Sequence, residues 1–215
     1  SDESRGLGDV YKRQIEGGKS TAIVGQTGCG KSTLTKLLFR FYDPHKGEIS
    51  IDKQKLKDCK MDSIRSIIGV VPQDTIMFNN TIGYNLSYGN PNASIKEIRK
   101  VVELCNLDDF IESLDLKYET IVGERGLKLS GGEKQRIAIA RMMLKKPKIL
   151  ILDEATSALD SKTEKLVLDS IDEYFKNSTK IIIAHRLTTI RNSEKIVVMS
   201  KGKIIEQGKH SNLIK

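Results

Sequence analysis

The chain has 215 residues, which suits one domain, or one domain with an inserted lobe, rather than two independent domains. No apolar run approaches the roughly 18 residues that a membrane-spanning helix needs, so we expect this polypeptide to be soluble by itself. Thirty-six Lys and Arg against 28 Asp and Glu give a net charge of +8. The charges are scattered, and they suit phosphate-bearing ligands, nucleic acid or an acidic membrane surface. The three cysteines lack CxxC spacing and indicate neither a disulfide framework nor a zinc site.

The first part of the chain has the pattern of alternating strands and helices. Residues 1–14 show neither strand alternation nor a helical stripe, and we expect a frayed or non-native start. A short buried strand at 21–24 and a glycine-rich turn lead into a helix at 31–42, where apolar residues recur at helical spacing. Residues 47–52 alternate like a hairpin strand, and 67–71 form a further apolar strand.

The middle of the chain, from about residue 79 to 146, has a mostly helical pattern. Two S-x-x-E sequences, which begin at Ser94 and Ser130, are typical of helix N-termini. A later helix is expected to open with Ser161 and Glu164. Further strands are expected at 149–152, 179–184, 195–199 and 203–206.

Strands that alternate with helices predict an α/β fold with a mainly parallel sheet, and the expected hairpins add an antiparallel β portion. We expect one domain over residues 15–215. Its core would comprise about residues 15–78 and 147–215, and a helical subdomain at about 79–146 would interrupt it.

One segment has the complete pattern G-x-x-x-x-G-K-S between an expected strand and an expected helix. In such a loop the backbone N–H groups converge on phosphate, and the helix N-terminus adds its positive end. Lys31 then supplies a charge toward the β- and γ-phosphates, and the Ser32 hydroxyl ligates Mg²⁺. A tight structural turn is the alternative, which the flanking strand and helix disfavour. The residues of this segment expected to bind ATP are Gly25, Gln26, Thr27, Gly28, Cys29, Gly30, Lys31, Ser32 and Thr33.

The apolar strand expected at 149–152 ends in two carboxylates, Asp153 and Glu154. Strands of a parallel sheet present their carboxyl ends to the ligand crevice, so both residues should lie beside the phosphate loop. Successive strand side chains point to opposite faces, so the two cannot share one role. We expect Asp153 to hold Mg²⁺ and Glu154 to polarise an attacking water. Helix capping is the structural alternative for both.

Further motifs match one known family in chain order. The segment LSGGEKQR at 129–136 resembles the signature motif of ATP-binding cassette (ABC) proteins. Gln73 resembles the family's Q-loop residue, Asp160 lies in a stretch similar to its D-loop, and His185 resembles its switch histidine. The stretch at 120–126 is similar to the exporter X-loop, and the stretch at 73–90 looks most like mitochondrial half-transporters of the iron–sulfur and heavy-metal-tolerance type.

The resemblance implies an ABC ATPase fold, which is a phosphate-loop NTPase core with an inserted helical subdomain, and it implies ATP and Mg²⁺ as ligands. The implied catalytic residues are Glu154, His185 and Lys31. The implied Mg²⁺ ligands are Ser32, Gln73 and Asp153, and Gln73 also belongs to the implied ATP site. A satisfied core histidine is the structural alternative for His185, and an ordinary turn residue is the alternative for Gln73.

The signature residues are expected to act on a second ATP. Ser130, Gly131 and Gly132 would form a small anion-binding nest at a helix N-terminus. One chain needs only one such site per ATP, and the family arrangement is a head-to-tail dimer in which this nest caps the partner's nucleotide. A plain capping box is the structural alternative for this segment. The residues expected to reach the partner's ATP are Leu129, Ser130, Gly131, Gly132 and Glu133.

We therefore expect the ATP-hydrolysing domain of an ABC exporter half-transporter. Its partners would be ATP, a second copy of the domain and a membrane-spanning part that this sequence lacks, and no nucleic acid is expected. The cassette would lie on the cytosolic or matrix side of a membrane, and the subfamily resemblance suggests the mitochondrial inner membrane.

The main rival is a non-transport ABC ATPase that acts on nucleic acid or ribosomes, which the charge of +8 would suit. Only 56 residues separate Gln73 from Ser130 and no sustained heptads appear, which weighs against the coiled-coil arms of DNA-repair members. One departure from the family concerns the base. Family members stack adenine on an aromatic residue farther upstream than Tyr11, which lies only 14 positions before Gly25, so we expect this stacking to be missing.

Overall fold

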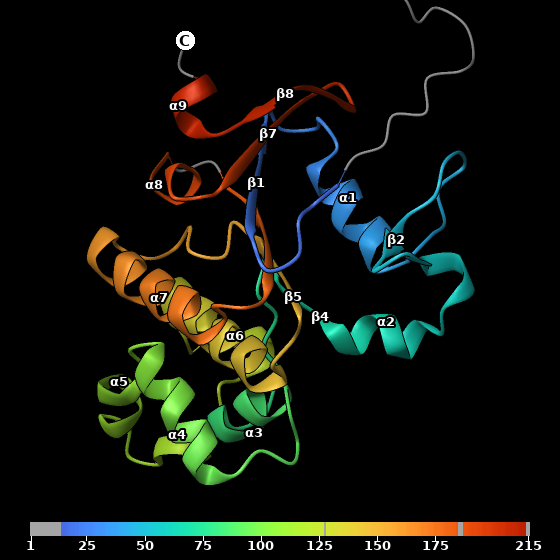
Figure 1. The fold of residues 1–215 in the computed structure, drawn as a ribbon. Helices are drawn as coiled ribbons and strands as arrows, with labels where there is room; N and C mark the ends of the chain where they lie inside the picture. Colours follow the sequence, from blue (N-terminus) through green and yellow to red (C-terminus); the bar gives the residue numbers. More distant parts are fainter. Residues whose placement is uncertain (1–13, 127, 185–186, 214–215) are drawn as a thin grey trace, which may run out of the picture.

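The fold is built around a six-stranded sheet, which Figure 1 shows in the computed structural model. The structure describes residues 14–126, 128–184 and 187–213. The strand order is β4-β5-β6-β1-β7-β8; β4, β5, β6, β1 and β7 run parallel, and β8 pairs antiparallel with β7. The strands of this sheet are β1 (Ser20–Gly25), β4 (Ile68–Val71), β5 (Ile149–Asp153), β6 (Thr179–Ile183), β7 (Lys195–Ser200) and β8 (Lys203–Gly208).

A small antiparallel sheet lies apart from the main one and pairs β2 (Ser50–Ile51) with β3 (Gln54–Lys55). The mainly parallel sheet with antiparallel additions confirms the predicted fold class. The α-helices are α1 (Lys31–Leu38), α2 (Met61–Ile67), α3 (Ile82–Ser87), α4 (Ile95–Leu104), α5 (Asp108–Glu112), α6 (Gly131–Lys145), α7 (Ser161–Tyr174), α8 (Leu187–Arg191) and α9 (His210–Leu213). Short 3₁₀ helices span Leu56–Asp58, Lys117–Glu119 and Glu124–Gly126. No helix in the described part of the chain is both long and apolar enough to cross a membrane.

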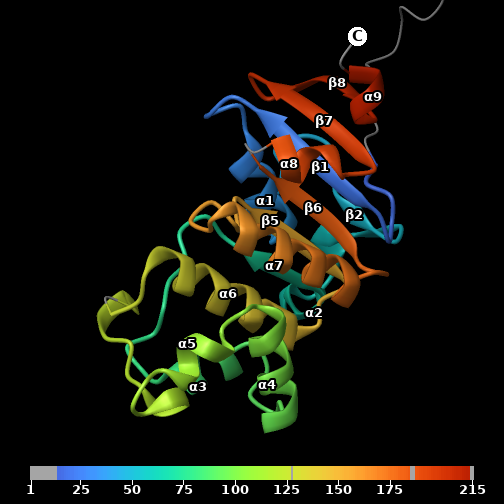
Figure 2. The same cartoon turned by 90° about the vertical axis from the view of Figure 1, so that its left-hand side faces the viewer.

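Helices cover both faces of the main sheet (Figures 1 and 2). The alternation along β5 explains this arrangement, because successive strand side chains point to opposite faces. Leu150 and Leu152 belong to the core shared with α6 and α7, whereas Ile151 packs in a second core with side chains of α1 and α2. The unbroken apolar run at 149–152 is therefore what a strand covered by helices on both faces requires.

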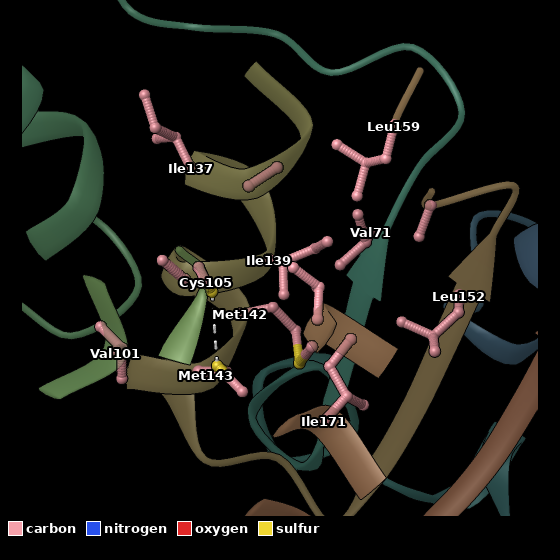
Figure 3. Close-up of a cluster of buried hydrophobic side chains, with 14 of the residues drawn as sticks. Val71, Val101, Cys105, Ile137, Ile139, Met142, Met143, Leu152, Leu159 and Ile171 are labelled. Carbon is pink, nitrogen blue, oxygen red and sulfur yellow. Dashed lines mark hydrogen bonds between the residues drawn. The ribbon is translucent and has the colours of Figure 1, made fainter. Parts of the chain in front are cut away.

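Helix α6 lies between the sheet and the helical lobe formed by α3, α4 and α5 (Figures 1 and 2). Figure 3 shows its side chains meeting Val71 of β4 and Ile171 of α7 on one side and Cys105 after α4 on the other. The Cys105 sulfur lies 3.7 Å from the sulfur of Met143, and burial raises the pKa of this thiol to about 12. A helix enclosed by neighbours in this way is apolar around much of its circumference, as α6 is.

The S-x-x-E patterns at Ser94 and Ser130 are confirmed as capping boxes that open α4 and α6. The expected start of α7 at Ser161 is confirmed. Asp160, rather than Ser161, is the N-cap, and its carboxylate accepts hydrogen bonds from the backbone N–H groups of Lys162 and Thr163. Aspartate and serine are comparable caps, so the local pattern alone does not separate the two positions.

The helix expected at 31–42 is shorter in the structure and ends at Leu38. Arg40 has a positive φ of 51°, and its guanidinium donates to the carbonyl oxygens of Leu56 (2.9 Å) and Cys59 (3.0 Å). These distant partners turn the chain away from the helix axis. Phe41, which the helical pattern placed on the apolar face, is 64% exposed.

Candidate functional site

The glycine-rich loop joins the end of β1 to the start of α1 and is shaped by two glycines. A Cβ on Gly25 would lie 2.3 Å from the carbonyl oxygen of Met199, near the end of β7. Only glycine, which has no side chain, therefore fits at this position. Gly30 is the N-cap of α1 and has a φ of 108°, a left-handed conformation that favours glycine. The loop therefore depends on glycine for space at one end and for backbone conformation at the other.

The N-terminus of α1 lacks the groups that normally cap a helix. It has no capping side chain and no acidic residue in its first turn, whereas α4 and α6 each begin with a capping box. The first N–H groups of a helix have no partner within the helix, and the helix dipole adds partial positive charge there. This end of α1 therefore offers donors to an anion.

Lys31 lies inside the loop and is only 7% exposed. Its ammonium donates to the carbonyl oxygens of Gly25 (2.7 Å) and Gln26 (3.1 Å) and contacts the sulfur of Cys29 at 3.8 Å. The N–H of Gly202, in the turn between β7 and β8, donates to the carbonyl oxygen of Cys29 at 3.0 Å. The loop is thus braced from within and from the neighbouring turn.

The carboxyl ends of three strands bring the other predicted residues to the same edge of the sheet. Asp153 ends β5 and is in register with Ile183, the last residue of β6, which lies beside β1. Val71 of β4 is in register with Leu152, so Gln73, which is exposed, follows β4 next to the end of β5. His185 lies outside the described residues, as does Tyr11.

Glu154 adopts an unusual backbone conformation directly after β5. Its φ is +50°, in the left-handed region that residues other than glycine rarely occupy. Its N–H donates to the carbonyl oxygen of Ile183 at 2.8 Å, which continues the pairing between β5 and β6 by one residue. Backbone strain of this kind persists where surrounding contacts hold it, and it is common at functional sites.

The expected signature residues lie at the N-terminus of α6, about a hundred residues after the phosphate loop in the sequence. The Ser130 hydroxyl accepts the N–H of Glu133 (3.3 Å), and the Glu133 carboxylate accepts the N–H of Ser130 (2.7 Å). The capping-box alternative is therefore present in the structure. Ser130 and Gly131 are exposed whereas Leu129 is buried, and a hydroxyl that accepts one bond still has a hydrogen to donate.

Buried polar contacts near these motifs were not predicted from the sequence. Thr156 donates from its hydroxyl to the Glu164 carboxylate at 2.7 Å, and Gln135 of α6 contacts the segment after β5. A signal for Gln135 was available, because it lies four residues before Ile139 on the apolar side of the helix. A polar residue on a buried helix face needs hydrogen-bond partners, and these indicate a second element.

Asp160, the expected D-loop residue, has its pKa lowered by hydrogen bonds from the side chain and backbone of Thr163. It is exposed, at the N-terminus of α7. A separate polar hollow, lined in part by Lys19, Glu194 and Lys195, lies at the amino ends of β1 and β7. That is the sheet edge opposite Gly25, and no predicted site residue lines it.

A strand, a glycine-rich loop with an enclosed lysine, and an uncapped helix start, placed beside an acidic strand end, define the phosphate-loop class of nucleotide-binding proteins. Comparisons with known proteins narrow this class. A sequence profile described as "ABC transporter" matches residues 10–157, and the chain belongs to the ABC transporter family. It is an ABC-type ATPase domain, as predicted, and the comparisons do not favour the rival acting on nucleic acid or ribosomes.

Individual relatives agree with this assignment. The chain is 52% identical over 219 residues to the mitochondrial iron-sulfur clusters transporter ABCB7 of Danio rerio, covering 96% of this chain and 30% of that protein. It is 50% identical to the human protein of the same name, covering 94% of this chain and 27% of that protein. It is also similar to the ABC transporter ATM1 of Toxoplasma gondii, at 49% identity over 98% of this chain and 19% of that protein.

A solved structure described as a bacterial Atm1-family ABC exporter with ATP bound superposes with a TM-score of 0.91 at 50% identity. The match covers 93% of this chain and 35% of that chain. The predicted resemblance to mitochondrial half-transporters of the iron–sulfur type is thereby confirmed. The present chain spans about a third or less of the length of these proteins.

Proposed function

We propose that this chain is the ATP-driven part of an exporter half-transporter and that the loop from Gly25 to Ser32 binds the triphosphate of Mg-ATP. The observation that carries the proposal is the uncapped start of α1 beside the enclosed ammonium of Lys31. Backbone N–H groups of the loop and helix would hold the β-phosphate, and Lys31 would exchange its carbonyl partners for phosphate oxygens. Thr33, exposed in the first turn of α1, would contribute to the same anion site.

The side chains proposed to hold Mg²⁺ fit that ion. Ser32, Gln73 and Asp153 offer a hydroxyl, an amide oxygen and a carboxylate, and Mg²⁺ prefers oxygen ligands from few side chains together with waters and phosphates. The strand register supports placing the amide beside the carboxylate, because Val71 pairs with Leu152. When bound, Mg²⁺ neutralises charge on the phosphate oxygens.

Glu154 is proposed as the general base that accepts a proton from the attacking water. It follows Asp153 directly but leaves the strand conformation, so the two carboxylates have different orientations available to them. A carboxylate that ligates a cation is a poor proton acceptor, because the cation stabilises its ionised form. Glu154 is therefore the proposed base, and Asp153 is the proposed ligand of the metal. His185 is proposed to orient the γ-phosphate and the water.

A second copy of the domain is proposed to complete each site. Ser130 and Gly131 are exposed at the N-terminus of α6, although most of α6 is buried. A hydroxyl and a small-residue turn at a helix start suit an anion, and one chain already has its phosphate site on α1. Head-to-tail pairing would bring this nest, and Asp160 nearby, to the partner's ATP.

The helical lobe presents an exposed apolar patch that is proposed to dock the membrane-spanning part. Ile76, Phe78, Tyr84 and Tyr88 are between 37% and 69% exposed, and the rings of Phe78 and Tyr88 lie 4.4 Å apart. Contiguous exposed aromatic residues are typical of interaction surfaces. The lobe at about residues 79–146 would thus transmit ATP-driven movement to a membrane domain. The relatives named as mitochondrial support a mitochondrial location, and the inner membrane is proposed as the membrane.

Calorimetric titration with Mg-ATP tests the central assignment. Replacing Lys31 with Ala removes a charge-assisted phosphate contact and should weaken binding by about 1.5 to 3 kcal/mol. Lys36→Ala, an exposed lysine of the same helix, is the matched control and should bind like the parent chain. Equal ATP affinity in the Lys31→Ala and parent proteins would exclude the proposed phosphate site.

A further inference from the structure

Gln135 is buried in the second turn of α6, where it is 3% exposed, and both ends of its amide are used. Its Nε2 donates to the Ser157 hydroxyl oxygen at 2.9 Å, and its Oε1 accepts the N–H of Ala158 at 2.9 Å. The same Nε2 lies 3.4 Å from the carbonyl oxygen of Glu154. One side chain of α6, the signature helix, thus contacts the segment at 154–160. This D-loop segment runs from the proposed base, Glu154, to Asp160.

This segment is a series of turns, in which the N–H of Ser157 donates to the carbonyl oxygen of Glu154 (3.1 Å) and the N–H of Leu159 donates to that of Thr156 (3.0 Å). It leaves the strand at Glu154 with a positive φ and reaches α7 at the cap Asp160 without forming regular structure between them. Thr156 is anchored to Glu164 of α7. Gln135 supplies the corresponding attachment to α6, so the segment is held between two helices that lie side by side in Figures 1 and 2.

The signature glycines pack against the same segment. A Cβ built on Gly131 would lie 3.3 Å from the Cβ of Ala158, and one built on Gly132 would lie 3.4 Å from the Ala158 carbonyl oxygen. The proposed anion nest and the D-loop segment are therefore in direct contact within one chain. The hydrogen-bonded amide of Gln135 lies next to this contact and fixes the position of the D-loop segment relative to the nest.

We propose that Gln135 is a positioning residue that fastens the D-loop segment to the signature helix, so that the nest and Asp160 meet the partner's ATP as one rigid unit. The inference rests on the proposed head-to-tail pairing. It assigns Gln135 no contact with nucleotide. Its loss should leave ATP binding to the phosphate loop of the monomer intact and should weaken only the nucleotide-dependent association of two copies.

The test uses the Glu154→Gln chain, in which hydrolysis should be blocked and the ATP-bound pair should accumulate. Gln135→Leu in this background leaves the Ala158 N–H and the Ser157 hydroxyl without the amide. Sedimentation with Mg-ATP should show a dimer dissociation constant raised about tenfold, because the loss of the acceptor for the part-buried N–H of Ala158 costs a free energy of about that size. ATP affinity, measured by calorimetry on dilute monomer, should stay within about twofold of the background. Gln207→Leu, an exposed glutamine of β8, is the matched control.

A second variant tests the same contact independently, in case Gln135→Leu does not fold. Ser157 is exposed, and Ser157→Ala removes one acceptor of Gln135 with little effect on the core. It should weaken association by a smaller factor, and the double variant should be no weaker than Gln135→Leu alone, because both changes break the same contact. Fully additive effects, unchanged association, or a parallel loss of monomer ATP affinity would each overturn the inference. Failure of the Glu154→Gln background itself to associate would instead refute the proposed pairing, and the inference with it.

Discussion

Asp153 and Glu154 are adjacent carboxylates whose backbones differ sharply. Asp153 is the last residue of β5 and pairs in register with Ile183, whereas Glu154 has a φ of +50°. The left-handed conformation turns the chain immediately after the strand, so the second carboxylate is freed from the strand's alternation. The alternation expected from the sequence therefore does not extend to Glu154, and we propose that the turn after β5 is what separates the two carboxylates, one for the metal and one for the water.

Substitutions at these two positions should separate the roles. Glu154→Gln keeps shape and hydrogen bonding but removes basicity, so single-turnover ATP hydrolysis should fall by about 10² to 10⁴ while ATP binding persists. Asp153→Asn should instead weaken Mg²⁺-dependent binding of ATP. Hydrolysis by Glu154→Gln at a rate near that of the parent chain would remove Glu154 from the role of base.

Some side-chain contacts near the candidate site could not be predicted from the sequence. The phosphate loop and the two carboxylates were predicted from spacing and residue type, whereas the signature nest was predicted from the family resemblance. The contacts of Gln135 and the anchoring of Thr156 on Glu164 were not, because they join side chains whose distance in space depends on how two helices pack. A buried polar residue can be suspected from a helical pattern, but its partners come only from the tertiary structure.

Helix α6 is the element that links the separate parts of the site. Its N-terminus carries Ser130, its second turn carries Gln135, and farther along Arg141 reaches the helical lobe. The Arg141 guanidinium donates to the backbone carbonyl of Asn85 (2.8 Å), to the Asn85 side-chain oxygen (2.9 Å) and to the carbonyl of Ile76 (3.2 Å). Burial lowers the pKa of Arg141, which nonetheless remains charged at neutral pH.

Arg141 should be essential for holding the exposed apolar patch of the helical lobe against α6. Its guanidinium carbon lies 5.5 Å from the ring centre of Phe78 and 5.8 Å from that of Tyr88. Arg141→Lys cannot reproduce the forked donors or the stacking and should lower the free energy of unfolding by about 2 to 4 kcal/mol. Urea unfolding provides the measurement, and Arg99→Lys, an exposed arginine on α4, is the control. Equal stability of the two variants would show that the patch is held by other contacts.

Element starts were easier to predict than element ends. The capping boxes at Ser94 and Ser130 are local sequence patterns, so both helix starts were predicted correctly. The end of α1 depends on Arg40, whose acceptors are 16 and 19 residues farther along the chain. Helical spacing through Phe41 contains no information about those acceptors, which explains the overlong helix expected from the sequence.

At the scale of the whole molecule, the strand order places the chemistry. The sheet runs β4-β5-β6-β1-β7-β8, so β1 lies between β6 and β7, which follow one another in the chain, and this order was beyond the sequence patterns. The shared edge could be predicted, because parallel strands present their carboxyl ends together. The phosphate loop, Asp153 and Gln73 follow three such ends. The family resemblance supplied the remaining step, which was the expectation of a second copy.

Association driven by ATP is the most direct test of this account. Glu154→Gln should sediment as a monomer without nucleotide and as a dimer with Mg-ATP, with one ATP bound per chain, because each nest needs the partner's triphosphate. Lys31→Ala added to the same chain should abolish the dimer by removing the phosphate contact on which it depends. A Glu154→Gln protein that binds Mg-ATP yet remains a monomer at every concentration would contradict the shared sites.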